Sequence, residues 1–215
     1  MGSAFLKGYQ LISILIALAD GVLAAKSFQK RTPAGRFLGL ACVGAAVVDI
    51  SYLISILSSS YLLMSAMSSV YFVTIDFMLL CLLEFTVYFT KGSFSKSSKT
   101  LLRLLFAYAV FELQVFSVNP FREIAIHYVP RNTAIARFSY QMKPLHILHL
   151  GYTYFMVAAV LWLLVRKQLR VPREYRAQYT YVVLGILAVV GGQRRLPVLA
   201  GGERVQSAGL LHLRL

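Results

Sequence analysis

The sequence predicts an all-α protein, a polytopic transmembrane helical bundle with six predicted spans. Of its 215 residues, 58% are hydrophobic and only 14% are charged, and the mean hydropathy is +0.68. A soluble domain has about 25% charged residues, so this chain has too few charges to cover a surface in water. Most of its acids lie inside long apolar segments, and most of its bases lie between them. This distribution argues against a soluble enzyme, a nucleic-acid-binding protein and a disulfide-linked scaffold.

Six apolar segments account for the predicted spans, because a helix needs about 20 mostly apolar residues to cross a bilayer. The segments are residues 5–25, 37–57, 63–90, 101–118, 145–165 and 179–190. They are separated by a basic stretch at 26–36, three serines at 58–60, a polar stretch at 91–99, an extended polar loop at 119–143 and a basic stretch at 166–176. Small residues in the second span predict close helix packing there; they are Gly39, Cys42, Gly44, Ala45 and Ala46.

The basic residues predict the orientation, because short loops rich in Lys and Arg stay in the cytoplasm. The compact stretches 26–36, 91–103 and 166–176 each carry four or five bases, whereas the bases of 119–143 are spread over a longer loop. We therefore expect a multi-pass protein of the inner (plasma) membrane with its N-terminus outside. Acidic lipid headgroups can balance the net charge of +14. We therefore expect membrane lipids as partners and do not expect nucleic acid.

Residues 191–215 differ in composition from the rest of the chain. They are rich in Gly and Arg and contain no aromatic residue, and they cut the sixth span to about twelve residues, too short to cross a bilayer. Two interpretations stay open: a basic tail after a short interfacial helix, or translation in a shifted frame. We favour the second, since permitted codon choices one nucleotide later would complete the span. The expected organisation is a transmembrane domain at 1–190 and an atypical tail at 191–215.

Three stretches carry a resemblance to a known family: RTPAGRFLGLACVGAAVVDISYLISILSSS, YFVTIDFMLLCLLEFTVYFT and HLGYTYFMVAAVLWLL. Over residues 6–190 the layout resembles the N-terminal seven-transmembrane sensor region of bacterial histidine kinases and diguanylate cyclases. The resemblance implies a seven-helix sensory input module for signal transduction, with six of its spans present here. It implies as partners an unknown small ligand, a cytoplasmic effector that this chain lacks, and a homodimer as a further assembly to consider. We expect no enzymatic activity from the chain itself.

The acids inside the spans are candidate ligand-binding residues, because charge in a membrane is costly and usually functional. Asp76 and Glu84 share one predicted helix, about 12 Å apart along its axis. Tyr88 is one turn from Glu84 and could partner it, whereas Asp76 has only Phe72 and Leu80 at those positions. The partner of Asp76 must therefore come from another helix, a water or a ligand. Two interpretations stay open: a cavity that senses a ligand or protons, or protonated acids that hold the packing together.

Further candidates lie on other segments. Asp49, together with Asp20 and Glu112, would extend a polar seam through the bundle, although packing is the favoured interpretation for the latter two. Arg131 and Arg137 lie in the outer loop among aromatic residues, a combination that suits an anionic or amphipathic ligand. The alternative for these arginines is a solvated loop on the headgroups.

No cofactor and no metal site is expected. Cys42 and Cys81 both lie in apolar segments. His146 and His149 are three residues apart, but no acid or cysteine close in sequence completes a ligand set. We therefore expect His127, His146 and His149 to lie at the membrane interface.

Two other membrane functions compete with a sensor. A small proton-coupled transporter would use the intramembrane acids, but the predicted spans contain no proline and no paired broken helices. A retinal-type photoreceptor needs a lysine within the bundle, and no span has one at mid-membrane. The transporter remains the alternative to the sensor.

Overall fold

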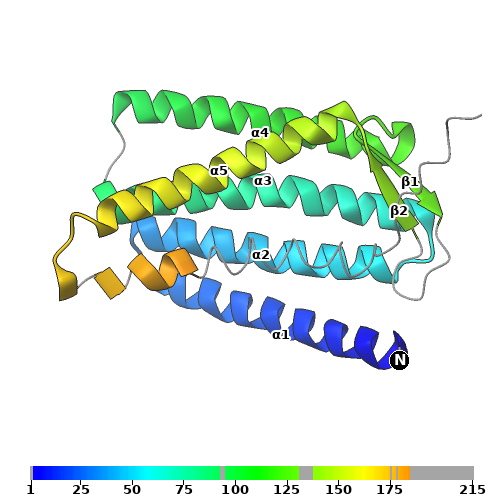
Figure 1. Cartoon of the computed structure of the whole chain (residues 1–215), viewed down its shortest axis with the longest axis horizontal. Helices are drawn as coiled ribbons and strands as arrows, with labels where there is room; N and C mark the ends of the chain where they lie inside the picture. The colour runs from blue at the N-terminus through cyan, green and yellow to red at the C-terminus, as the bar shows by residue number, and fades with distance from the viewer. Residues whose placement is uncertain (1, 93–94, 131–137, 175, 178, 185–215) are drawn as a thin grey trace, which may run out of the picture.

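The computed structural model describes residues 2–92, 95–130, 138–174, 176–177 and 179–184. Within them five long helices lie side by side, and each runs antiparallel to the helix before it (Figure 1). They are α1 (Gly2–Gln29), α2 (Pro33–Leu57), α3 (Tyr61–Lys91), α4 (Lys96–Arg122) and α5 (Pro144–Gln168). All five are long and apolar enough to cross a membrane, so the predicted all-α polytopic bundle is confirmed. Residues 179–184 are also helical, while the rest of the predicted sixth span and the tail lie outside the described residues.

Local chemistry sets where the helices begin. The Thr32 hydroxyl oxygen accepts a hydrogen bond from the backbone N–H three residues on, and Ser60 and Ser95 do the same at the starts of α3 and α4. Each cap satisfies a donor that the first helical turn leaves without an intrahelical partner. Pro33 and Pro144 occupy the first turns of α2 and α5, where a missing N–H removes no helical hydrogen bond.

Helix α4 is longer at both ends than the predicted span 101–118. It begins at Lys96 and runs through Pro120 to Arg122. Pro120 lies in the last turn, where it interrupts the helical hydrogen bonds only once. Glu123 then ends the helix in the left-handed conformation (φ 48°) and donates its N–H to the Asn119 carbonyl at 2.8 Å.

A β-hairpin occupies part of the segment that the sequence predicts to be a polar loop, which corrects that prediction. Strands β1 (Ile126–Pro130) and β2 (Phe138–Met142) pair antiparallel at the end of the bundle near the α2–α3 connection (Figure 1). Side chains alternate along β1: Ile126 and Tyr128 are buried, whereas His127 is half-exposed. This alternation is the pattern of a strand with one buried face, but the prolines and arginines around it obscure it in the sequence.

Asn119 fastens the hairpin to the end of α4. Its side-chain oxygen accepts hydrogen bonds from the backbone N–H groups of Ala125 at 2.8 Å and Ile126 at 3.0 Å, and its amide donates to the Ile126 carbonyl at 3.3 Å. Asn119 is fully buried, so these bonds replace hydration that the backbone has lost. The Lys143 N–H donates to the Ala125 carbonyl at 3.0 Å, so the same turn also positions the start of α5.

The close packing predicted for the small residues of α2 is confirmed on both of its sides. A Cβ on Gly39 would lie 2.8 Å from the ring of Phe28 on α1, and a Cβ on Gly44 would lie 3.0 Å from Met78 on α3. The two glycines therefore let α2 approach both neighbours closely. Helix α3 packs in turn against α2, α4 and α5, which makes it the central helix of the described bundle.

The apolar core lies among α3, α4 and α5, and lipid-facing side chains cover the outside. The largest group of buried apolar residues includes Leu79, Leu83, Met156, Val160 and Leu164. Helix α1, in contrast, leaves most of its large apolar side chains exposed, among them Leu11, Leu15 and Leu18. Contiguous exposed apolar surface of this kind is what a helix presents to lipid.

Asn119→Ala is expected to loosen the hairpin. The substitution leaves the buried N–H groups of Ala125 and Ile126 without acceptors, which we expect to lower the free energy of unfolding by on the order of 2 kcal/mol. Faster hydrogen exchange of residues 124–130, measured by mass spectrometry in detergent or nanodiscs, would report the loss. Ser117→Ala is the matched control, because Ser117 is exposed two residues away. Equal exchange in the two variants would contradict the anchoring role.

Candidate functional site

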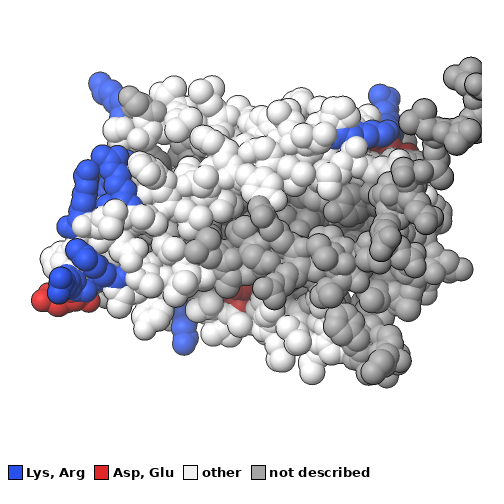
Figure 2. Space-filling view, in the orientation of Figure 1, with Lys and Arg blue, Asp and Glu red and all other residues white. Residues whose placement is uncertain are grey.

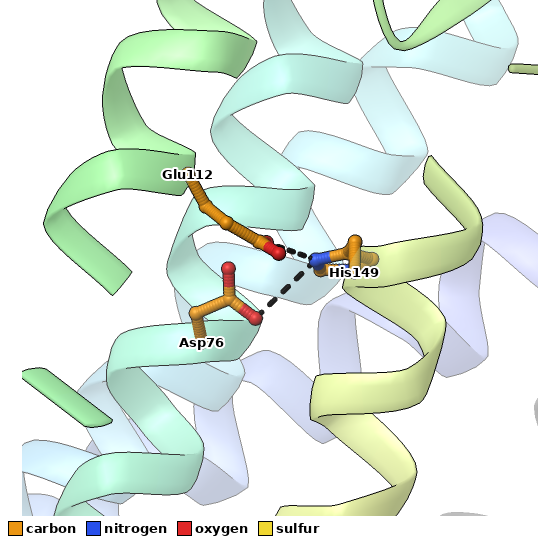
Figure 3. A group of neighbouring side chains, drawn as sticks. All are labelled: Asp76, Glu112 and His149. Atoms are coloured by element: carbon orange, nitrogen blue, oxygen red, sulfur yellow. Dashed lines mark hydrogen bonds and ion pairs between the residues drawn. The ribbon is translucent and has the colours of Figure 1, made fainter. Parts of the chain in front are cut away.

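Three ionisable side chains from three different helices meet inside the bundle. Asp76 comes from the middle of α3, Glu112 from α4 and His149 from the second turn of α5 (Figure 3). Their exposed fractions are 0%, 2% and 2%. The three side chains, which we call the α3–α5 triad, therefore lie in an environment that excludes water.

The imidazole of His149 is the centre of the triad. Its Nδ1 lies 2.5 Å from Oε2 of Glu112 and 3.4 Å from Oδ1 of Asp76. One atom from each of the three side chains can be chosen so that all lie within 4.8 Å of one another. Both carboxyl groups thus point at the same ring nitrogen (Figure 3), and they link α3 and α4 to α5 by electrostatic contacts.

Aromatic rings pack against the triad on the side of the hairpin. The rings of Phe72 on α3 and Phe116 on α4 each stand edge-on to His149, with centroids 5.3 Å away. His146 lies one turn earlier on α5 and stacks on His149 at 5.6 Å. Because these rings replace solvent, charges in the triad interact more strongly than they would in water.

The triad has hydrogen-bonding capacity that the described residues do not use. Neither carboxylate oxygen of Asp76 completes a hydrogen bond with them, nor does Oε1 of Glu112. The buried hydroxyl of Tyr108, one turn before Glu112, also completes no hydrogen bond within the described residues, although it interacts electrostatically with Glu112. Buried polar groups are normally satisfied, so these three groups leave the triad with capacity to bind a further partner.

An apolar pocket of about 490 Å³ opens on the bundle surface between α4 and α5. Its lining includes Tyr108 and Tyr152, whose ring centroids are 4.6 Å apart. Tyr152 donates a hydrogen bond to the Leu105 carbonyl at 3.3 Å, which holds its ring in place. The pocket lining thus includes Tyr108, which lies one helical turn from Glu112 in α4.

A second ionic cluster lies outside the membrane-spanning segments, at the hairpin end. The Glu123 carboxylate accepts hydrogen bonds from the Tyr61 hydroxyl and from the ring of His127, and Lys143 donates to the Glu123 carbonyl. The Tyr61 bond, followed by the His127 bond, lowers the pKa of Glu123 below its usual value. A depressed carboxyl pKa stabilises the folded state above the unfolded value of about 4.3, and this contribution is lost as the pH falls through the folded value.

Of the predicted site residues that the structure describes, only Asp76 belongs to the triad, and Glu84 and Asp49 lie outside it. Asp76 finds its partner on another helix, as expected, in His149. Glu84 lies eight residues further along α3 and is half-buried, outside the triad. Asp49 is half-buried on α2, near enough to Asp20 of α1 to interact with it electrostatically.

Other expectations fare differently. Arg131 and Arg137 lie outside the described residues. His146 and His149, expected at the membrane interface, are both buried inside the bundle, each with 2% exposure. Sequence reasoning assigned Glu112 to packing and His149 to the membrane interface, because the groups that each one meets lie on other helices. The available signal was that three separate spans each carry at least one ionisable group.

One comparison with known proteins finds a match. The family model described as the N-terminal 7TM region of histidine kinase matches residues 11–193. The chain belongs to this family. No curated protein and no solved structure matches it. As a histidine-kinase 7TM region, it is an integral membrane protein whose family suggests a sensory module, and the five described helices provide its bundle.

His149→Gln is expected to destabilise this 7TM region strongly. It leaves Asp76 and Glu112 facing each other without a cation, and removing one partner of a buried ion pair costs about 3–5 kcal/mol. Adding Glu112→Gln should recover part of this loss, with a coupling energy of about 0.5–3 kcal/mol. Unfolding of the single and double variants in mixed micelles would measure it. Glu84→Gln is the control, and strictly additive effects of the two triad substitutions would contradict the coupling.

Proposed function

We propose that this chain is the membrane-embedded sensory input module of a bacterial signal-transduction protein, and that the α3–α5 triad is where the signal acts. The observation that carries the proposal is the convergence of Asp76, Glu112 and His149 from three helices in a buried site. Each helix contributes one group. A change in the charge or ligation of any one group therefore changes the contacts between helices.

The energetics suit a switch. A ligand shifts a conformational equilibrium only if it binds the two states with different affinity. Polar groups in a low-dielectric interior supply such differences, because a charge that loses its partner there is strongly destabilised. A shift of 1–2 Å between helices is a common response of this kind, and α5 runs directly into the basic segment 166–176.

The distribution of charge supports an orientation for the module. The α1–α2 and α3–α4 connections and the end of α5 lie at one end of the bundle, where Lys and Arg gather (Figure 2). The exposed bases of this end include Lys30, Arg36, Lys91, Lys96, Arg166 and Arg173. Because such loops stay in the cytoplasm, this end faces the cytoplasmic effector and the hairpin end faces outward across the inner membrane.

The continuity of the helices favours a sensor over the alternative, a small proton-coupled transporter. Transporter sites near mid-membrane commonly rest on helices that are broken there. Each of the five helices in the described part of the chain is continuous through its interior. A continuous helix transmits a displacement at one depth to its end, which is the behaviour that signalling to an effector requires.

Reporter fusions test the orientation. Fusions after Arg36, Lys96 and Lys167 should be active with a cytoplasmic reporter, and one after Arg131 should be active with a reporter that works outside the cytoplasm. The reason is the concentration of bases at the end that carries the first three sites. A cytoplasmic signal after Arg131 would reverse the assignment.

Asp76→Asn tests the signalling role. The substitution keeps the side-chain shape but removes the charge, so the output of a histidine-kinase effector joined after the sensory helices should change about five-fold or more. Autophosphorylation in nanodiscs would measure the output, with membrane level measured by immunoblot. Glu84→Gln on the same helix is the matched control and should leave the output near wild type. If Asp76→Asn also leaves it unchanged at equal membrane level, the triad is structural and the proposal fails.

A further inference from the structure

We propose that Asp76, Glu112 and His149 form a binding site for a divalent transition-metal ion, for which Zn²⁺ is the natural probe. This inference deepens the proposed function, and rests on it, by naming the class of ligand that the sensory site takes. The grounds are the chemistry of the three ligand groups, their geometry, their net charge and the unused oxygens of Asp76.

The ligand types and their spacing fit a small coordination sphere. One imidazole nitrogen with carboxylate oxygens is a set that Zn²⁺ uses in three-ligand sites, with metal–ligand bonds of about 2.0–2.2 Å. Ligand atoms around a tetrahedral ion are then roughly 3.3 Å apart. The 3.4 Å separation of Nδ1 of His149 and Oδ1 of Asp76 already matches this, and the 2.5 Å contact of His149 with Glu112 would need to open by about 1 Å.

Charge favours a divalent ion over the hydrogen-bonded state. Two ionised carboxylates and one imidazolium leave one uncompensated negative charge in a site with at most 2% exposure, and buried net charge is strongly unfavourable. A divalent ion that replaces the proton on Nδ1 of His149 makes the site neutral. It also removes the need for either acid to be protonated.

Asp76 provides an observation that is independent of the clustering. Its side chain is fully buried and points toward His149 and Glu112 (Figure 3). Both of its oxygens nevertheless lack hydrogen bonds within the described structure. A carboxylate in this condition is oriented for a ligand that the three side chains would share.

The same residues select among ions. An imidazole nitrogen favours Zn²⁺, Ni²⁺ or Cu²⁺ over Mg²⁺ and Ca²⁺, which prefer sites made only of oxygen. Three protein ligands leave a fourth position open, as in sites that bind a water or an exogenous ligand. Tyr108, which lines the pocket between α4 and α5, interacts electrostatically with Glu112.

Binding would move the helices that carry the site. Opening the Glu112–His149 contact by about 1 Å would separate α4 from α5 locally. The metal–Asp76 bond would at the same time hold α5 on α3. A displacement of this size is within the range of interhelical shifts that transmit signals. Metal occupancy is thereby linked to the geometry of α5.

The test is direct binding to the whole chain in lipid nanodiscs, stripped of metal with a chelator. Titration with Zn²⁺ against a fluorescent competing chelator should show one equivalent bound. Asp76→Asn, Glu112→Gln and His149→Gln should each weaken binding by about 100-fold or more, since even outer-shell partners contribute 10- to 100-fold. Glu84→Gln, Asp49→Asn and His127→Gln are matched controls and should stay within about two-fold of wild type.

Two measurements keep the result interpretable if a triad variant folds poorly. X-ray absorption of the wild-type Zn²⁺ form should show only nitrogen and oxygen ligands, including imidazole. His149→Cys keeps a metal ligand, and with Co²⁺ it should add a thiolate charge-transfer band that the wild type lacks. The inference is overturned if the wild type binds no stoichiometric Zn²⁺. It is also overturned if the triad variants bind as the wild type does, or if His127→Gln abolishes binding.

The outcome separates this inference from the proposed function. If Asp76→Asn changes effector output but the wild type binds no metal, the sensory role stands and the metal site falls. If Zn²⁺ binds at the triad but neither Zn²⁺ nor Asp76→Asn changes effector output, the metal site stands and the sensory role falls.

Discussion

The structure depends on one constraint: ionisable groups placed inside an apolar bundle must find partners there, because the bilayer offers none. Asp76 on α3 has no polar neighbour one turn away on its own helix. It meets that requirement through His149 on α5, which is shared with Glu112 on α4. Three helices are thereby held at fixed depths relative to one another, since sliding any of them by one turn would strand a buried charge.

Hydrogen bonds at the hairpin end join the end of α4 to the start of α5, the two helices that carry Glu112 and His149. Asn119 ends α4 against the backbone of Ala125 and Ile126, and Lys143 bonds to the same turn immediately before α5 begins. His149 lies only a few residues later, in the second turn of α5. The fold thus links the hairpin end of the molecule to the buried triad through a short path of hydrogen bonds.

Different interactions stabilise the packing of α1 and α2 and the packing of α3, α4 and α5. Helices α1 and α2 approach through glycines, with Gly39 against Phe28 and Gly44 against Met78 on the next helix. Such contacts depend on shape and tolerate little rearrangement. Helices α3, α4 and α5 share a core that includes the polar triad and a pocket between α4 and α5. Polar contacts with unused capacity can be exchanged for others, so this half is suited to respond to a ligand.

The sequence by itself determined the class of protein, most of the helices and the fact that Asp76 needed a partner. Apolar length and basic loops are local properties, and a single segment is enough to show them. Sequence did not reveal the hairpin, because its short alternation at Ile126 and Tyr128 lies among prolines and arginines. It did not reveal the site either, since Glu112 and His149 are 37 residues apart and lie on different helices. Only the tertiary structure decided which helices pack together and at what depth, because packing of apolar faces, and not local spacing, brings those two residues to Asp76.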